Sequence, residues 1–153
     1  MDLSQYLQFA LGKQEYAIPL CYIREIIKPL EIRNLLGAPD YVKGITKVRD
    51  EVLTIIDLHR KFGVDAKERT GGEPRIIILD HGNACLGLYV DDVIEIIETN
   101  SLEAVPAIVY FGTISQIIKL EDNILPILDI ERLLSKDVTA WLNSEEKSEP
   151  LIE

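Results

Sequence analysis

The chain carries two related copies of one sequence pattern. Residues 16–27 (YAIPLCYIREII) and 86–97 (LGLYVDDVIEII) share an apolar pattern that ends in Glu-Ile-Ile in both. Residues 52–62 (VLTIIDLHRKF) and 124–134 (ILPILDIERLL) repeat further on, in the same order and at nearly the same spacing. Two ordered matches favour an internal duplication over chance. The period is too long for a solenoid unit, so the pattern predicts two similar small β units packed as one body.

The two halves are expected to depend on each other. The chain has 153 residues, of which 47% are hydrophobic. A half of this length would be marginally stable alone, because small domains bury too small a fraction of their surface. The composition is nevertheless sufficient for one core, so we expect the halves to share it.

Charge and segment composition exclude several classes of function. The formal net charge is −10, which repels phosphate backbones and anionic headgroups, so we expect no nucleic-acid partner. The N-terminal residues lack a basic start followed by a long apolar run, and the longest uncharged stretch, residues 104–118, is too short and polar to cross a bilayer. We therefore expect no direct membrane insertion. Cys21 and Cys85 lie in apolar segments, as reduced core thiols of a cytosolic protein would.

Short apolar runs separated by turn residues predict many short strands. Hairpins are expected at 45–58, turning at 49–51, at 114–130, turning at 121–123, and at 75–90, turning at 81–83. Residues 21–27 are compatible with a strand or with one or two helical turns, because apolar periodicity does not separate the two here. Many short strands with few helical turns favour closed or nearly closed antiparallel barrels, since closure removes exposed edges.

An aspartate follows the return strand of two of these hairpins. Asp57 and Asp129 each precede a short helical pattern, where an aspartate is a good N-cap. Gly63 is expected to end the first of these helices in the left-handed conformation. A catalytic carboxylate pair is the alternative, but capping explains both residues and their repetition by one local cause.

The remaining polar residues give no catalytic pattern. His59 and His81 are expected in a turn or at the surface, and Asp91-Asp92 in a turn or at a solvated edge. The sequence contains no H-E-x-x-H, C-x-x-C or phosphate-loop motif. We therefore expect a protein that is not an enzyme, has no cofactor or metal, and acts through its surfaces.

An ordered series of motifs resembles the CheW family of chemotaxis coupling proteins. The series covers residues 5–135 and keeps its order throughout. Its members are residues 16–20 (YAIPL), 23–26 (IREI), 39–45 (PDYVKGI), Arg49, 52–58 (VLTIIDL), 75–78 (RIII), 87–93 (GLYVDDV) and 127–134 (ILDIERLL).

The resemblance implies a mainly β fold of two intertwined five-stranded SH3-like barrels with short helices. We place the CheW-like domain at residues 1–135, with a first barrel at about 16–63, a second at about 75–134, and intertwined termini. Residues 136–153 are expected to form a short helix carrying Trp141 and then a disordered acidic tail. The implied function is a cytoplasmic adaptor that joins chemoreceptor tips to the regulatory domain of the histidine kinase CheA, without a cofactor.

The resemblance also implies receptor- or kinase-binding residues, namely Arg49, Ile23, Glu25 and Gly44. The hairpin tip departs from the family, because Asp50 stands where a glycine is usual. If the turn requires a positive φ there, Asp50 tolerates it less well than glycine. Thr54, Asp92 and a shorter loop after Pro106 are further departures. They leave open an alternative, a divergent module that binds kinase or another signalling partner but couples receptors poorly.

Ile23 defines a further expectation about the seam between the halves. We expect its side chain to be at least partly accessible beside an apolar groove that takes a partner helix, with Glu25 nearby as a polar rim. The alternative is that Ile23 belongs to the core, as Val93 does at the equivalent point of the second half.

Overall fold

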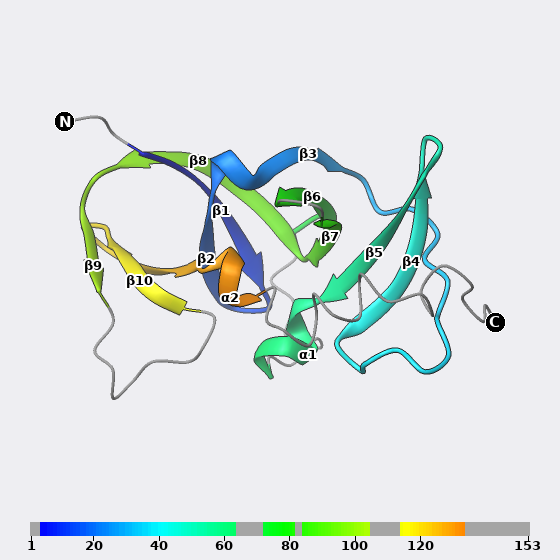
Figure 1. Cartoon of the computed structure of the whole chain (residues 1–153). Helices are drawn as coiled ribbons and strands as arrows, with labels where there is room; N and C mark the ends of the chain where they lie inside the picture. The colour runs from blue at the N-terminus through cyan, green and yellow to red at the C-terminus, as the bar shows by residue number, and fades with distance from the viewer. Residues whose placement is uncertain (1–3, 64–71, 82–83, 105–113, 134–153) are drawn as a thin grey trace.

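Two β barrels lie side by side in the computed structural model of the chain (Figure 1). The structure describes residues 4–63, 72–81, 84–104 and 114–133. The predictions for residues 136–153 and for the loop after Pro106 concern segments outside these ranges.

The strands form two sheets, which we name barrel A and barrel B. Barrel A is a six-stranded sheet in the order β8 (Asp92–Thr99), β1 (Ser4–Leu11), β2 (Gln14–Pro19), β11 (Ile124–Leu128), β10 (Ile114–Lys119), β9 (Leu102–Ala104). Barrel B is a five-stranded sheet in the order β3 (Ile23–Ile27), β6 (Arg75–His81), β7 (Ala84–Val90), β5 (Glu51–Asp57), β4 (Val42–Val48). The helical elements are η1 (Leu20–Tyr22), α1 (Leu58–Phe62) and α2 (Ile130–Leu133). The predicted mainly β, SH3-like class is confirmed, and barrel A has six strands where five were expected.

The two repeats exchange strands. Barrel A joins the β1–β2 hairpin of the first repeat to β8, β10 and β11 of the second, and barrel B joins the β6–β7 hairpin of the second repeat to β3, β4 and β5 of the first. A parallel pairing links the two parts of each barrel, through β2 and β11 in barrel A and β5 and β7 in barrel B. The strand order of barrel B therefore equals that of β8 to β10 in barrel A, as a duplication requires.

Sheet membership differs from the expected barrel limits of 16–63 and 75–134. Residues 75–90, expected in the second barrel, pair with β3 and β5 of the first repeat. A sequence repeat shows which segments are alike. It does not show which segments pair, and here each hairpin pairs with the other repeat.

Each barrel is closed by one continuous run of chain. In barrel A, β8 ends at Thr99 on one sheet edge and β9 begins at Leu102 on the other, so the two edges meet at Asn100 and Ser101. In barrel B, the chain that leaves β3 reaches the opposite edge strand, where Arg33 and Ile45 exchange two backbone hydrogen bonds of 2.8 Å. This closure leaves few exposed strand edges.

Within the described ranges, the buried apolar side chains form three clusters. One fills barrel A around Ile118 and Leu125, and one fills barrel B around Ile55 and Ile78. The largest lies between the barrels and takes side chains from both sheets, including Phe9 of β1. Its members are Leu7, Phe9, Leu11, Tyr16, Ile18, Val42, Ile56, Leu58, Ile77, Leu79, Leu86, Leu88, Val90, Ile114, Leu128, Ile130 and Leu133. The predicted sharing of a core by the two halves is confirmed.

Helix α1 begins and ends at the residues that the sequence predicts. The Asp57 side chain accepts a 3.0 Å hydrogen bond from the His59 backbone N–H at the start of α1, and Gly63 ends the helix at φ 71°. Both predictions for α1 are confirmed, and the equivalent cap by Asp129 stays a prediction. At the β4–β5 turn Arg49 has a positive φ of 58°, whereas Asp50 does not have a positive φ. The turn therefore does not require a glycine at position 50.

We expect Gly44 to be required for the closure of barrel B. It has φ 150°, and a Cβ on it would overlap the Arg33 carbonyl oxygen at the closing bridge. Gly44→Ala should therefore lower the free energy of unfolding by about 2 kcal/mol or more, because backbone atoms would have to move.

Urea denaturation measures this loss, and Gly63→Ala is the matched control. Gly63 also has a positive φ, but open space surrounds the place of its Cβ, so that variant should lose only about 1 kcal/mol. Equal losses in the two variants would contradict the steric explanation for Gly44.

Candidate partner-binding site

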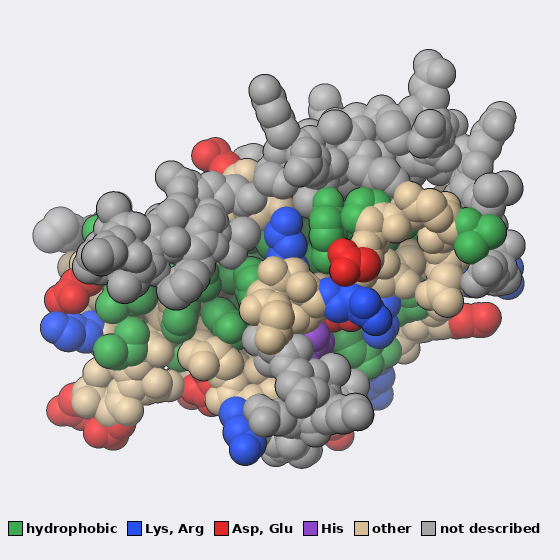
Figure 2. All heavy atoms as spheres, turned by 90° about the horizontal axis from the view of Figure 1, so that it is seen from below, with side chains coloured by type: hydrophobic (Ala, Val, Ile, Leu, Met, Phe, Trp, Pro, Cys, Tyr) green, Lys and Arg blue, Asp and Glu red, His purple; other side chains and the backbone are tan. Residues whose placement is uncertain are grey.

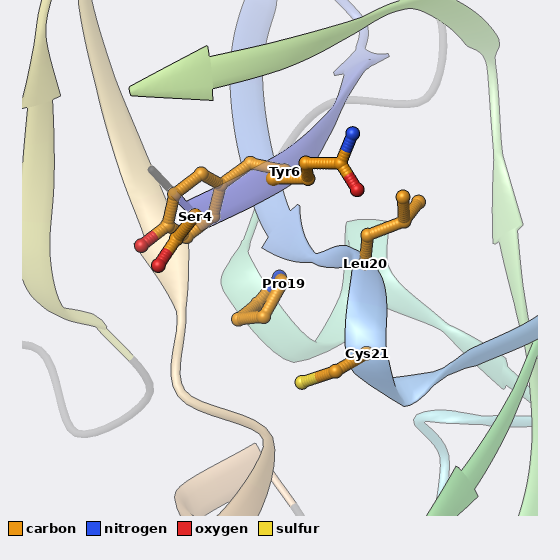
Figure 3. A pocket seen from close by; sticks show the side chains of 6 residues that line it. Ser4, Tyr6, Pro19, Leu20 and Cys21 are labelled. Atoms are coloured by element: carbon orange, nitrogen blue, oxygen red, sulfur yellow. The ribbon is translucent and has the colours of Figure 1, made fainter. Parts of the chain in front are cut away.

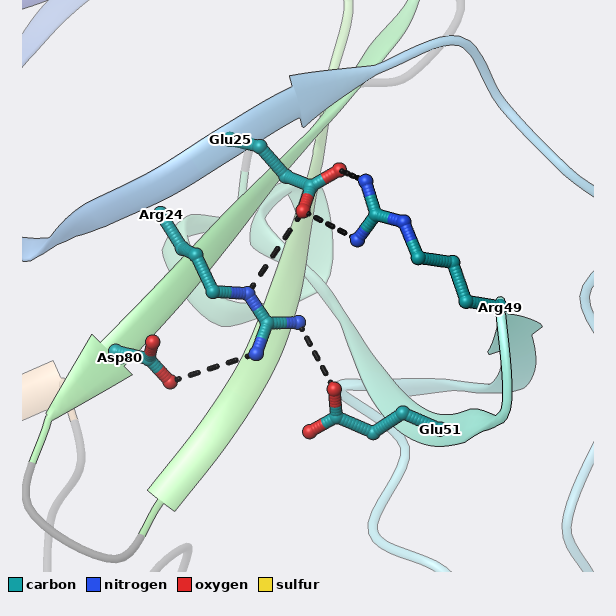
Figure 4. Close-up of polar contacts among 5 residues, drawn as sticks. All are labelled: Arg24, Glu25, Arg49, Glu51 and Asp80. Atoms are coloured by element: carbon teal, nitrogen blue, oxygen red, sulfur yellow. Dashed lines mark hydrogen bonds and ion pairs between the residues drawn. The ribbon is translucent and has the colours of Figure 1, made fainter.

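Two of the residues predicted to bind partners are in direct contact. Arg49, in the β4–β5 turn, donates two hydrogen bonds of 2.8 Å to the two carboxylate oxygens of Glu25 on β3 (Figure 4). The bidentate geometry fixes both groups more firmly than a single contact would. The Arg49 side chain is 71% exposed and that of Glu25 23%, so the pair presents a guanidinium at the surface of barrel B.

A second arginine connects this pair to neighbouring strands. Arg24 donates a 3.1 Å hydrogen bond to Glu51 at the start of β5, and lies 3.9 Å from Asp80 on β6 and 3.9 Å from Glu25 (Figure 4). We name these five residues the charged cluster. Sequence reasoning identified Arg49 and Glu25 but missed Arg24, Glu51 and Asp80. An exposed charge on a strand carries no signal in the sequence that distinguishes it from an ordinary solvated residue.

Arg49 holds an unfavourable backbone conformation. Among the described residues it is the one non-glycine residue with positive φ, a conformation that costs an L-residue energy and is normally left to glycine or asparagine in tight hairpin turns. Such strain is found preferentially at functional sites. The turn therefore presents this particular side chain although a glycine would fit its backbone better.

Ile23 begins β3 and follows, in the sequence, residues that line an apolar depression. Its side chain is partly exposed and packs against the shared core, so the predicted partial accessibility is confirmed. The depression has a volume of about 410 Å³ and lies against β1, the end of β2 and η1 (Figure 3). It is lined by Ser4, Gln5, Tyr6, Pro19, Leu20 and Cys21. Glu25, a member of the charged cluster, follows Ile23 on the same strand.

Gly44 has a different place from the other predicted residues. It is buried at the closure of barrel B, where it leaves room for the Arg33 backbone. The structure therefore gives it a steric role, and a direct contact with a partner stays a prediction.

Three expectations about polar residues were wrong. His59, expected at the surface or in a turn, is buried with a 7% exposed side chain. Asp91, expected in a turn or at a solvated edge, lies in the bend between β7 and β8 but is only 3% exposed. Cys21, expected in the core, is exposed. The exposure of each of these side chains depends on which distant segment packs beside it, and the local sequence does not report this.

Cys85 is partly buried. Its burial is the largest cause, and a hydrogen bond with Asp80 the next, of a thiol pKa raised to about 12.

Acidic, basic and apolar side chains all reach the surface on the face seen in Figure 2. The exposed apolar side chains of the described residues include Ile94 and Ile96 on β8. Among the described residues, no three or more His, Cys, Asp or Glu side chains are placed to hold a metal ion. No helix in the described ranges has the length and apolar character needed to cross a membrane.

The fold and this surface define a binding module with two barrels, and comparisons with known proteins place it in a family. Residues 5–138 match the family model described as "CheW-like domain". The chain is 30% identical to the chemotaxis protein CheW of Klebsiella aerogenes over 153 residues, covering 95% of this chain and 90% of that protein. It is 29% identical to CheW of Helicobacter pylori over 140 residues, covering 89% and 84%.

A solved structure supports the same family. The crystal structure of the scaffolding protein TtCheW from Thermoanaerobacter tengcongensis matches with a TM-score of 0.79 and 25% identity, covering 90% of this chain and 91% of that one. The chain belongs to the CheW family. It is accordingly a scaffolding adaptor of chemotaxis signalling and not an enzyme.

We expect the Arg49 contact to govern the titration of Glu25. Hydrogen bonds from Arg49, with the charges of Arg49 and Arg24, hold the pKa of Glu25 below 4.5. The pair should therefore persist at neutral pH and be lost as the pH falls through this lowered value. In Arg49→Ala the pKa of the Glu25 carboxyl should rise towards 4.5. A titration monitored by ¹³C NMR of the Glu25 side chain would measure this change. Lys47→Ala, at an exposed position on the same hairpin, should leave it unchanged. An unchanged midpoint in Arg49→Ala would show that the pair does not form.

The two cysteines should differ in reactivity. With a pKa of about 12, on the order of one Cys85 thiol in 10⁴ is ionised at pH 8, and the thiolate is the reactive form. An alkylating reagent at pH 8 should thus modify the exposed Cys21 first, as peptide mass spectrometry would report. In concentrated urea both should react alike. Similar rates in the folded protein would contradict the partial burial of Cys85.

Proposed function

We propose that the protein is a cytoplasmic adaptor that joins the tips of chemoreceptors to the regulatory domain of the histidine kinase CheA. Family membership supports the adaptor role. The observation that carries the finer assignment is the Arg49–Glu25 pair, because Arg49 has a strained backbone and its exposed guanidinium is held in fixed geometry by the Glu25 carboxylate. A surface pair contributes little to folding, so the conformation is better explained by binding.

The depression before β3 supports a helical partner on the receptor side. Its apolar lining residues include Pro19 and Leu20, and the partly exposed Ile23 follows in the chain. An amphipathic helix recognises such a surface through apolar residues on one face. The charged cluster, on barrel B, offers charges of both signs that fix the orientation of a partner and exclude mismatched ones.

Arg49→Ala is expected to weaken association with a receptor tip while leaving the melting temperature nearly unchanged. Loss of the guanidinium removes the fixed charge, and the truncated residue keeps the fold. Binding of the purified protein to a receptor fragment and to the CheA regulatory domain would be measured by calorimetry, with Lys47→Ala as the control on the same hairpin.

The two partners separate the possible outcomes. Receptor affinity equal to that of the parent would refute the role of Arg49. If the parent binds the kinase domain but no receptor fragment, the protein is the divergent module that couples receptors poorly. If the parent binds neither partner, the proposed function is wrong.

A further inference from the structure

Arg24 lies at the centre of the charged cluster, where each nitrogen of its guanidinium faces a different carboxylate (Figure 4). Its Nη2 donates a 3.1 Å hydrogen bond to Glu51, whereas Nη1 is 3.9 Å from Asp80 and Nε is 3.9 Å from Glu25. A separation of 3.9 Å is too long for a hydrogen bond, but a change of side-chain rotamer can close it. Arg24 is therefore bonded to one carboxylate and placed beside two others.

The Glu25 carboxylate lies between two guanidinium groups. Arg49 donates a 2.8 Å hydrogen bond to each of its oxygens, and Arg24 Nε faces Oε2, one of the two oxygens that Arg49 already occupies. A carboxylate oxygen can accept more than one hydrogen bond. Glu25 can thus be held by either arginine without a movement of the strand that carries it.

The three carboxylates around Arg24 differ in their access to water. The side chain of Glu25 is 23% exposed, whereas those of Glu51 and Asp80 are 50% and 55% exposed. An unpaired charge is more costly where less water reaches it. If Glu25 lost Arg49, a shift of Arg24 from Glu51 to Glu25 would therefore be favourable, because water can solvate Glu51 more fully.

Arg49 is placed to leave Glu25 for a partner. Its side chain is 71% exposed and projects from a turn. A guanidinium binds a carboxylate through parallel hydrogen bonds from its planar fork. A carboxylate of a partner would consequently compete with Glu25 for the same donors.

The duplication shows that a barrel of this type can form without the two arginines. Glu95 keeps the place of Glu25 in the other half. Ile94 and Glu121 stand where the arginines would be, yet barrel A has the corresponding strand order. The presence of Arg24 beside Glu25 therefore needs an explanation outside the fold.

We propose that Arg24 is a positioning residue that takes over the Glu25 carboxylate when Arg49 turns to bind a carboxylate of a partner. The exchange keeps Glu25 paired, so Arg49 can change its partner without leaving an unpaired charge behind. The carboxylate of the partner rests on the proposed function. The exchange between the two arginines is a property of the free protein.

A titration of Glu25 tests the exchange without any partner. The effect of Arg24→Gln on the Glu25 pKa would be measured by ¹³C NMR in the parent and in Arg49→Ala. Because Arg24 should hold Glu25 once Arg49 is absent, Arg24→Gln should raise this pKa more in Arg49→Ala than in the parent. Lys28→Gln removes an exposed charge just after β3 and is the matched control, whose effect should be the same in both backgrounds. An equal rise on Arg24→Gln in both backgrounds would overturn the proposal, because Arg24 would then act only as a fixed charge.

Calorimetry with a receptor fragment tests the use of the exchange in binding. Arg24→Gln should weaken binding about two- to fivefold, the range expected of an exposed ion pair, and should keep the melting temperature of the parent. Lys28→Gln should bind as the parent does. Unchanged affinity in Arg24→Gln would overturn the proposal. If the parent does not bind the fragment, the proposed function and the partner carboxylate both fail, and the titration still decides whether Arg24 takes over Glu25.

Discussion

The structure depends on the exchange of strands between the two repeats. Each barrel is completed by a hairpin from the other half, and each contains one parallel pairing that only this exchange can supply. Neither half can close a barrel alone, and the largest core exists only when both sheets are present. The apolar content of the chain therefore stabilises a single cooperative body instead of two marginal ones.

The duplication also separates what the fold needs from what the surface adds. Glu25 recurs as Glu95, but Arg24, Arg49 and Glu51 correspond to Ile94, Glu121 and Asn123 in the other half. Barrel A forms the same strand order without these charges. The charged cluster is thus an addition to barrel B that the fold does not demand, which is why we assign it to recognition.

Local features could be predicted from the sequence and distant pairings could not. The cap by Asp57 and the end of α1 at Gly63 arise within a few residues, and the motif series identified the family and its barrels. The burial of His59 depends on Asp91, 32 residues away, and that of Asp91 on Gly12, 79 residues away. The expectation that residues 75–90 belong to the second barrel differs from the structure for the same reason, because similarity between segments does not report their pairing. The positive φ of Arg49 follows from a turn geometry to which its side chain gives no clue.

Fusion of the two repeats in one chain has a consequence for assembly. Two identical halves that exchanged strands as separate molecules would form a symmetric pair and would have to carry every surface feature twice. In a single chain the halves can diverge. Here Arg49 stands at the hairpin tip of barrel B where the other half has Glu121, and His59, which faces Asp91, stands where the other half has Glu131. The molecule therefore has two unlike ends. It can take a defined direction between two different neighbours, as a symmetric particle could not.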